Sequence, residues 1–233
     1  MNKGILYLIP IPISEGNLES LSPAIKNTIP EITHFFVENV RTARRFIKSI
    51  VPETVIDNLT FLEINKHQES DLPQLKSWIE QGHAVGVMSE SGCPGIADPG
   101  ADVVAYAQLL NVKVVPLVGP SSLLLALMAS GFNGQSFCFN GYLPVKEPQR
   151  SKEIKALELQ SKRLHQTQII IETPYRNNHL LQDLLKYCTD TTKLCIAFNI
   201  TASDQFIKTK TIKQWKQAAP TLSKAPCIFL ILA

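Results

Sequence analysis

The sequence predicts an α/β protein made of two α/β domains. In the first half of the chain, short apolar runs alternate with amphipathic stretches. That order is typical of a mostly parallel sheet with helices on its faces, because parallel strands need long crossovers that a helix fills. In the second half, some expected strands follow one another without a helix between them, which predicts a mixed sheet. We place the N-terminal domain at 1–118 and the C-terminal domain at 119–233.

The elements of the first domain follow from hydrophobic period. Strands are expected where apolar residues form a short continuous run, and helices where apolar residues recur on one face. The expected strands are 4–9, 33–37, 59–64, 84–88 and 112–118, and the expected helices are 18–29, 39–49, 71–81 and 101–110.

The second domain begins with a helix that Ser121 or Ser122 is expected to cap and that Gly131 is expected to end. Further helices are expected over 149–164, 177–187 and 212–218, and strands over 136–140, 167–171, 193–198, 206–210 and 227–232. The last strand is the apolar run CIFLIL.

Composition bounds the function without naming it. The 233 residues are 45% hydrophobic and 18% charged, as in an ordinary globular protein, and the net charge of +3 is lower than a dedicated nucleic-acid binder usually carries. The five cysteines form no CxxC pair and no His-flanked cluster, so we expect no metal site and no disulfide framework. With no apolar run of membrane-spanning length, we expect a soluble cytoplasmic protein without a membrane partner.

The most informative segment is SESGCPGIADPG, residues 89–100, which lies between an expected strand and an expected helix. Twelve residues with three Gly, two Pro and two Ser leave much of their backbone uncovered by side chains. In an open α/β sheet, ligands bind at the carboxyl ends of the strands. The segment is therefore predicted to hold a small molecule, and a plain turn is the alternative.

A second segment, ENVRTARRFIK (38–48), gives an amphipathic helix with a basic side. At 100° per residue, one side carries Val40, Ala43, Ile47 and Ile50, and the opposite side carries Arg41, Arg44, Arg45 and Lys48. Such a stripe is either a solvated face or a surface that positions RNA phosphates with salt-dependent, sequence-blind affinity.

Several motifs together resemble one family. The segments SESGCPGIADPG, VVPLVGPSSLLLALMASGF, FCFNGYLP and ETPYR are similar to those of the tetrapyrrole methylase superfamily, and most similar in wording to its branch that methylates a ribose 2′-hydroxyl of small-subunit ribosomal RNA. The resemblance covers nearly the whole chain. It implies an S-adenosylmethionine-dependent methyltransferase whose cofactor lies between two domains. It also implies a homodimer whose partner is ribosomal RNA or the small ribosomal subunit.

The resemblance also implies site residues, at positions that match the family's motifs. Methyl transfer from a sulfonium needs positioning more than acid or base help, so no catalytic triad is expected. The implied cofactor contacts are Pro12, Ile13, Ser91, Gly92, Cys93, Ile96, Ser121, Ser122, Ile171, Ile200, Pro226 and Cys227. Glu38 and Arg41 are implied at the methyl acceptor.

Each of these residues also has a purely structural interpretation. Ser121 and Ser122 can be helix caps, and Cys93 and Cys227 can be small buried apolar residues. Glu172 and Arg176, in ETPYR, are more simply read as an ion pair or a cap at the next helix than as catalytic groups.

The chain also departs from the family's pattern. Asn39 stands where the family has Asp, Asn199 stands where it has Glu, and the loop after the first strand carries two additional residues. These changes leave three hypotheses open: an RNA methyltransferase, a methyltransferase for a small molecule or other acceptor, and a catalytically inactive protein that binds the cofactor or RNA.

Overall fold

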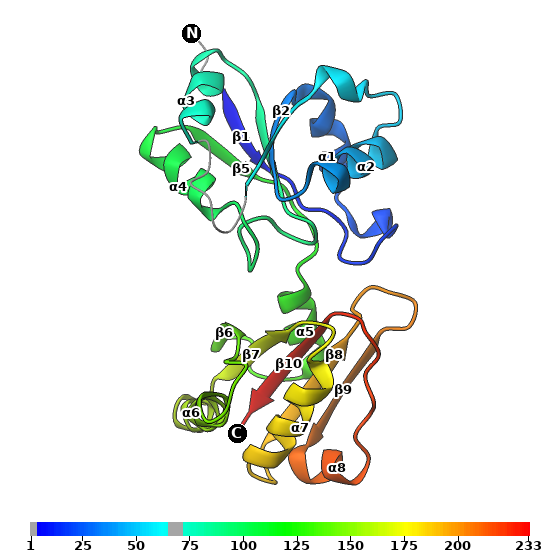
Figure 1. The fold of residues 1–233 in the computed structure, drawn as a ribbon, viewed down its shortest axis with the longest axis vertical. Helices are drawn as coiled ribbons and strands as arrows, with labels where there is room; N and C mark the ends of the chain where they lie inside the picture. The colour runs from blue at the N-terminus through cyan, green and yellow to red at the C-terminus, as the bar shows by residue number, and fades with distance from the viewer. Residues whose placement is uncertain (1–3, 65–71) are drawn as a thin grey trace. The chain divides into compact units, whose positions relative to one another are not determined.

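In the computed structural model, residues 4–64 and 72–233 are described, and the chain divides into two compact units, Met1–Ser121 and Ser122–Ala233 (Figure 1). The N-terminal unit is a five-stranded sheet in the order β3-β2-β4-β1-β5. The strands are β1 (Ile5–Leu8), β2 (His34–Val37), β3 (Thr60–Glu63), β4 (Val85–Met88) and β5 (Lys113–Pro116), and all their pairings are parallel. The predicted parallel sheet is therefore confirmed.

Helices cover both faces of this sheet, as Figure 1 shows. One face packs on α1 (Pro23–Thr28) and α2 (Val40–Ile50), and the other packs on α3 (Leu72–Glu80) and α4 (Ala101–Leu109). Burial on both faces explains why β4 is apolar along its whole length.

The expected helix over 18–29 is wrong, because the segment is broken into three pieces. Short 3₁₀ turns at Leu18–Ser20 and Ile29–Glu31 flank α1. Pro23 has no N–H to donate and fits only the first turn of a helix, so a new helix begins there, where the side chain of Ser22 accepts a hydrogen bond from the N–H of Ala24. In the helix expected over 71–81, Asp71 lies outside the described residues.

The C-terminal unit is a mixed five-stranded sheet in the order β6-β7-β10-β8-β9. Its strands are β6 (Phe137–Tyr142), β7 (Thr167–Glu172), β8 (Lys193–Phe198), β9 (Phe206–Thr211) and β10 (Cys227–Leu232). Strands β6 and β7 pair in parallel, whereas β10 runs antiparallel to both β7 and β8, and β9 antiparallel to β8. The last strand thus occupies the centre of the sheet, which confirms the predicted mixed topology and explains the apolar run CIFLIL.

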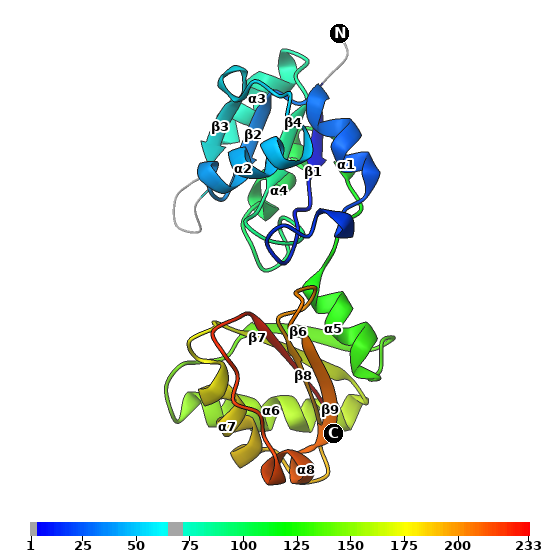
Figure 2. The ribbon, with the colours of Figure 1, turned by 90° about the vertical axis from the view of Figure 1, so that its right-hand side faces the viewer.

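The helices of this unit also lie on two faces (Figure 2). Helix α5 (Ser122–Ser130) packs on one face, and α6 (Gln149–Leu164), α7 (Asn177–Tyr187) and α8 (Ile212–Gln217) pack on the other. Trp215 of α8 is fully buried, and its Nε1–H donates to the carbonyl oxygen of Leu194 at 2.9 Å. In the described part of the chain, no helix has the length and apolarity that a bilayer crossing requires.

Candidate functional site

The segment 89–100 follows β4 at the carboxyl edge of the parallel sheet and contacts the loops that follow β1 and β5. Strand β4 pairs with β1, and β1 pairs with β5, so the loops after all three strands emerge side by side. We call residues 89–100 the cradle loop.

Hydrogen bonds join the cradle loop to both neighbouring loops. The N–H of Ile11 donates to the carbonyl oxygen of Gly92 at 2.9 Å, and the hydroxyl of Ser91 donates to the carbonyl oxygen of Ile13 at 3.4 Å. On the other side, the thiol of Cys93 contacts the carbonyl oxygen of Pro120, with 3.4 Å between sulfur and oxygen. The three loops therefore form one surface, and much of it is backbone.

Glycine is required at two positions of this surface. Gly92 is buried and has φ +65°, a left-handed backbone conformation that residues other than glycine rarely adopt. At Gly119, a Cβ atom would lie 2.2 Å from Cβ of Pro10. The loops after β1 and β5 thus approach so closely that only glycine fits between them.

Cys93 is suited to packing rather than to nucleophilic chemistry. The residue is half-buried, and burial raises the pKa of its thiol. A raised pKa keeps the sulfur protonated at neutral pH, and the thiolate is the nucleophilic form of cysteine. The cradle loop therefore offers shape and backbone hydrogen-bonding groups, which is the kind of site that a positioned group transfer needs.

Glu38, which follows β2, is tied directly to the cradle loop. Its Oε2 accepts a hydrogen bond from the N–H of Glu90 at 3.0 Å, and its own N–H donates to the carbonyl oxygen of Met88 at 3.1 Å. The hydroxyl of Thr42, on α2, donates to Oε1 of Glu90 at 3.1 Å. The structure thus brings Glu38 and the start of α2 beside the first turn of the cradle loop.

A cavity of about 550 Å³ opens in the N-terminal unit between the loop after β1 and α2. It is lined by Ile11, Pro12, Ile13, Glu15, Gly16, Leu18, Thr42, Arg45, Phe46, Ser49 and Glu90. Of the residues predicted at the site, Pro12 and Ile13 lie on it, whereas Glu38 and Arg41 do not. An apolar lining with a few charged groups is usual for a small-molecule pocket, and the volume lies within the usual range.

Sequence reasoning missed this cavity. Its lining comes from segments far apart along the chain, and the usable signal is the spacing of Thr42, Phe46 and Ser49, which recur at three and four residues and so share one side of α2. Arg45 belongs to both the basic side and the cavity, where its guanidinium pairs with the carboxylate of Glu15 at 3.2 Å.

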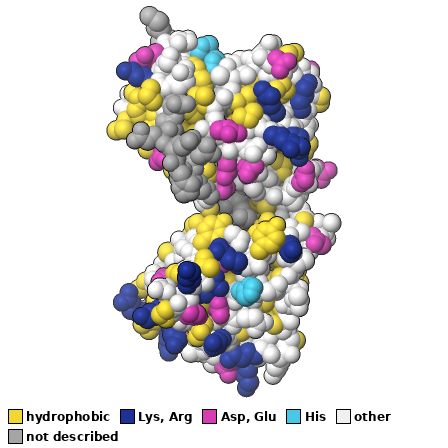
Figure 3. Space-filling view, viewed as in Figure 1, with side chains coloured by type: hydrophobic (Ala, Val, Ile, Leu, Met, Phe, Trp, Pro, Cys, Tyr) yellow, Lys and Arg dark blue, Asp and Glu magenta, His cyan; other side chains and the backbone are white. Residues whose placement is uncertain are grey.

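The basic side of α2 is exposed, as predicted, and Lys and Arg side chains gather over α2 in the N-terminal unit (Figure 3). The exposed residues are Arg41, Arg44, Arg45 and Lys48, and the buried residues are Ala43, Phe46, Ile47 and Ile50. Part of the charge is engaged within the unit, since the guanidinium of Arg44 lies over the ring of Phe61, 5.5 Å from its centroid. We call the four exposed residues the basic stripe.

Four predicted cofactor residues of the C-terminal unit lie together at one end of the three central strands of its sheet. Cys227 begins β10 opposite the last residues of β7 and β8, and the N–H of Asn199 donates to the carbonyl oxygen of Pro226 at 2.8 Å. Ile171 is the penultimate residue of β7, and Ile200 follows β8. The side chains of Ile200 and Cys227 are buried in the core, so these two positions offer backbone groups to a ligand. Burial also raises the pKa of the Cys227 thiol, which leaves it neutral.

The other predicted contacts differ in exposure. Ile96, in the cradle loop, is 51% exposed. Ser122 is the first residue of α5, and both it and Ser121 are half-buried.

The two asparagines that depart from the family's pattern have structural roles. Oδ1 of Asn39 accepts from the N–H of Thr42 at 3.0 Å and caps α2, and Asp and Asn are equally good caps. Asn199 has φ +48°, a conformation that Asn tolerates better than Glu does, and its amide donates to Oδ1 of Asp204.

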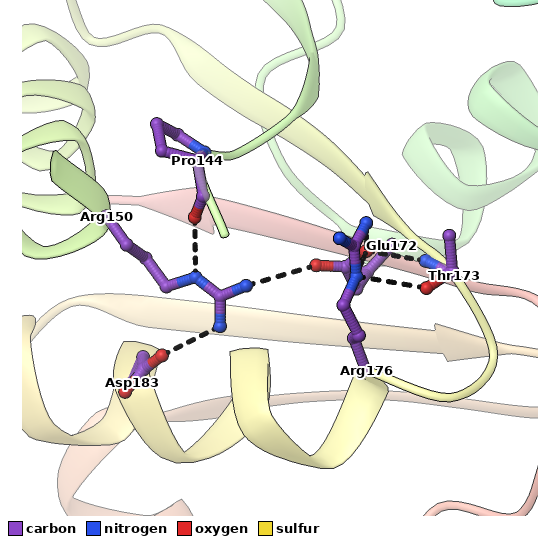
Figure 4. Close-up of polar contacts among 6 residues, drawn as sticks. All are labelled: Pro144, Arg150, Glu172, Thr173, Arg176 and Asp183. Carbon is purple, nitrogen blue, oxygen red and sulfur yellow. Dashed lines mark hydrogen bonds and ion pairs between the residues drawn. The ribbon is translucent and has the colours of Figure 1, made fainter. Parts of the chain in front are cut away.

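Glu172 and Arg176 form the ion pair that the sequence indicated, inside a larger buried network (Figure 4). The guanidinium of Arg176 lies 2.6 Å from Oε1 of Glu172, and that of Arg150 lies 3.5 Å from Oε2. Arg150 also pairs with Asp183 at 3.0 Å and donates to the carbonyl oxygen of Pro144 at 2.7 Å. The ion-pair interpretation of ETPYR is confirmed.

The sequence is similar to those of bacterial RNA methyltransferases. It is 28% identical over 236 residues to a ribosomal RNA small subunit methyltransferase I of Buchnera aphidicola subsp. Schizaphis graminum, an alignment that covers all of this chain and 79% of the relative. It is 33% identical over 187 residues to the protein of that name in Bacillus subtilis, which covers 80% of this chain and 61% of the relative. No family model matches the chain.

Solved structures share the fold. The methyltransferase CobJ aligns with 98% of this chain and 94% of its own, with a TM-score of 0.65 and 17% identity. The uroporphyrin-III-C-methyltransferase of Thermus thermophilus aligns with 98% of this chain and 92% of its own, with a TM-score of 0.57 and 14% identity.

Fold and relatives together define the class: the chain has the fold of the two solved methyltransferases, and it is itself a methyltransferase. Within that class, its sequence is similar to the ribosomal RNA small subunit methyltransferase I proteins of several bacteria.

Proposed function

We propose that this methyltransferase uses S-adenosylmethionine to methylate a ribose 2′-hydroxyl of small-subunit ribosomal RNA. The observation that carries the proposal is the cradle loop, hydrogen-bonded to the loops after β1 and β5 in a chain similar to ribosomal RNA methyltransferases over its whole length.

The cradle loop supports the proposal because its surface is lined largely by backbone. Gly92 allows a left-handed backbone conformation, and Gly119 allows an approach to Pro10 that a side chain would block. The hydroxyl of Ser91 and the carbonyl oxygen of Ile13 lie at the same edge. Ile171, Ile200, Pro226 and Cys227 of the C-terminal unit are proposed to complete the contacts. Bound there, S-adenosylmethionine would supply a methyl group on a positively charged sulfur, so the protein mainly positions two reactants.

The acceptor side of the proposal uses Glu38 and the basic stripe. Glu38 is fixed next to the cradle loop by its hydrogen bond from Glu90. Arg41 follows Glu38 by three residues and is exposed. It makes no ion pair with any residue in the described ranges 4–64 and 72–233. We assign Arg41 to an RNA phosphate, because guanidinium and phosphate form charge-assisted hydrogen bonds.

The decisive measurement is transfer of labelled methyl from S-adenosylmethionine to small ribosomal subunits that lack the modification. We expect label in the RNA, and we expect Arg41→Ala to lower the rate about tenfold while the affinity for S-adenosylhomocysteine stays the same. Lys26→Ala, which removes an exposed cation elsewhere in the N-terminal unit, is the matched control. Cofactor binding without methyl transfer to subunits would contradict the RNA acceptor, and absence of cofactor binding would indicate an inactive protein.

A small-molecule acceptor is the second candidate function, and the cavity between the loop after β1 and α2 favours it. That cavity has the volume of a small-molecule pocket and carries the carboxylates of Glu15 and Glu90. Methyl transfer to a small acceptor, with none to the ribosomal subunit, would support this candidate. The cytoplasmic location and the homodimer remain predictions.

The basic stripe gives a separate prediction about RNA affinity. The double substitution Arg44→Glu with Arg45→Glu is expected to weaken binding to small ribosomal subunits at low salt and to flatten the dependence of affinity on salt, because fewer counterions are released. The control exchanges two exposed lysines of the same unit, Lys26→Glu with Lys113→Glu, which changes the net charge equally. Equal affinities of the two double variants would favour the solvated-face interpretation.

A further inference from the structure

The C-terminal unit carries an exposed aromatic ring beside a cation, at residues outside the predicted cofactor and acceptor sets. Tyr175 is 75% exposed, among the highest values for a large apolar side chain in the described part of the chain. The ammonium of Lys224 lies over its ring, 5.3 Å from the ring centroid. We call Tyr175 and Lys224 the ring–cation pair.

A tight turn fixes the position of Tyr175. The N–H of Arg176 donates to the carbonyl oxygen of Thr173 at 2.9 Å, which closes a four-residue turn with Pro174 second and Tyr175 third. Beneath the turn, the fully buried carboxylate of Glu172 accepts from the N–H of Thr173 at 2.7 Å and pairs with Arg176 (Figure 4). The backbone that carries the ring is therefore held from below while the ring projects outward.

A second loop, from Leu222 to Ala225, is held in the same way and carries Lys224. The side chain of Asn178 accepts from the N–H of Leu222 at 2.9 Å and donates to its carbonyl oxygen at 2.8 Å. The amide of buried Asn177 donates to the carbonyl oxygen of Ala225 at 2.8 Å. Both ends of the loop are thus anchored on α7, the helix that begins directly after the turn.

The two anchored loops present a flat ring and an ammonium group to solvent. Single-stranded nucleic acid has groups complementary to both: flat bases for the ring and negatively charged phosphates for the ammonium. Unpaired bases stack on exposed aromatic rings without regard to sequence, and the adjoining phosphate pairs with a lysine. The ring is exposed and gains little from folding, which leaves it available for binding.

We propose that Tyr175 stacks on an unpaired base of the RNA acceptor and that Lys224 holds the adjacent phosphate. The inference rests on the proposed RNA-directed function and assigns part of the RNA to the C-terminal unit. The two loops also carry Ile171, Pro226 and Cys227 at their bases, so RNA held by the ring–cation pair lies beside residues proposed to contact the cofactor.

Fluorescence anisotropy with a short fluorescein-labelled oligouridine tests the pair in the full-length protein. Tyr175→Ala is expected to weaken binding about tenfold, whereas Tyr175→Phe, which keeps the ring, stays within about twofold of the wild type. Lys224→Gln should lower the slope of log affinity against log salt by about 0.7. The matched control is Tyr142→Ala, which removes another exposed tyrosine, 51% exposed, from strand β6.

Four outcomes would overturn the proposal. Wild-type affinity in Tyr175→Ala, or no binding of oligouridine by the wild type, removes the stacking site. A fall in affinity for S-adenosylhomocysteine with RNA affinity unchanged assigns Tyr175 to the cofactor. A change in sedimentation alone assigns the pair to a protein interface. Methyl transfer to small subunits by the wild type and by Tyr175→Ala at equal rates would leave the proposed function intact while the stacking site fails.

Discussion

Replacing Arg150 with methionine is expected to lower the free energy of unfolding of the C-terminal unit by about 3–5 kcal/mol. The guanidinium side chain is 5% exposed and lies between two carboxylates, Glu172 at 0% and Asp183 at 25% exposure. Methionine is close in volume, so the core stays filled. The loss comes from leaving Oε2 of Glu172, which makes no hydrogen bond, and the carboxylate of Asp183 without Arg150, while Arg176 stays paired with Oε1 of Glu172.

Urea unfolding followed by tryptophan emission measures this effect. The chain has two tryptophans, Trp78 in the N-terminal unit and Trp215 in the C-terminal unit, so a Trp78→Phe background reports the unit that contains Arg150. The control is Asp190→Asn, which breaks the ion pair of Asp190 with Lys216, whose side chains are 56% and 45% exposed. That change should cost less than about 1 kcal/mol.

A second substitution separates charge from packing. In the Arg150→Met background, Glu172→Gln should recover part of the lost stability, because a neutral amide costs less to bury than a carboxylate. Two results would contradict this account of the buried network. One is a free energy of unfolding of Arg150→Met equal to that of the wild type. The other is a double variant in which Glu172→Gln lowers the free energy of unfolding as much as it does in the wild type.

Regular elements could be predicted from the sequence where hydrophobic period and stop signals agree. Helices α6 and α7 have the predicted bounds. Each is a long amphipathic stretch, and the residues on either side of it interrupt the helical pattern. The helix expected over 18–29 failed because an apolar pattern continued through Pro23, and backbone chemistry at that proline outweighs the pattern.

The site could be predicted only where one short segment carries the signal. The cradle loop was visible because Gly, Pro and Ser gather directly after a buried strand. The cavity beside α2 was not visible, because its walls come from separate elements. Arg150 was also missed, since a single arginine near the start of a charged helix has the pattern of a surface residue until the fold places carboxylates around it.

A second large effect is expected from Gly119→Ala. The new methyl group would lie 2.2 Å from Cβ and 2.6 Å from Cγ of Pro10, well inside contact distance, and a proline ring has no rotamer that moves these atoms away. The loops after β1 and β5 must therefore separate. Overpacking of this kind costs roughly 1–3 kcal/mol, which corresponds to an affinity for S-adenosylhomocysteine about fivefold to 150-fold weaker if the closed arrangement is the one that binds.

Calorimetric titration with S-adenosylhomocysteine gives that affinity, and thermal unfolding shows whether the variant remains folded. Gly134→Ala is the matched control, because its Cβ would meet no atom within 4 Å and it lies outside the cradle and its neighbouring loops. A folded Gly119→Ala protein that binds as tightly as Gly134→Ala would mean that the spacing between Pro10 and Gly119 does not shape the cofactor site. Weaker binding, with Gly134→Ala unchanged, would connect this glycine contact to recognition of the cofactor.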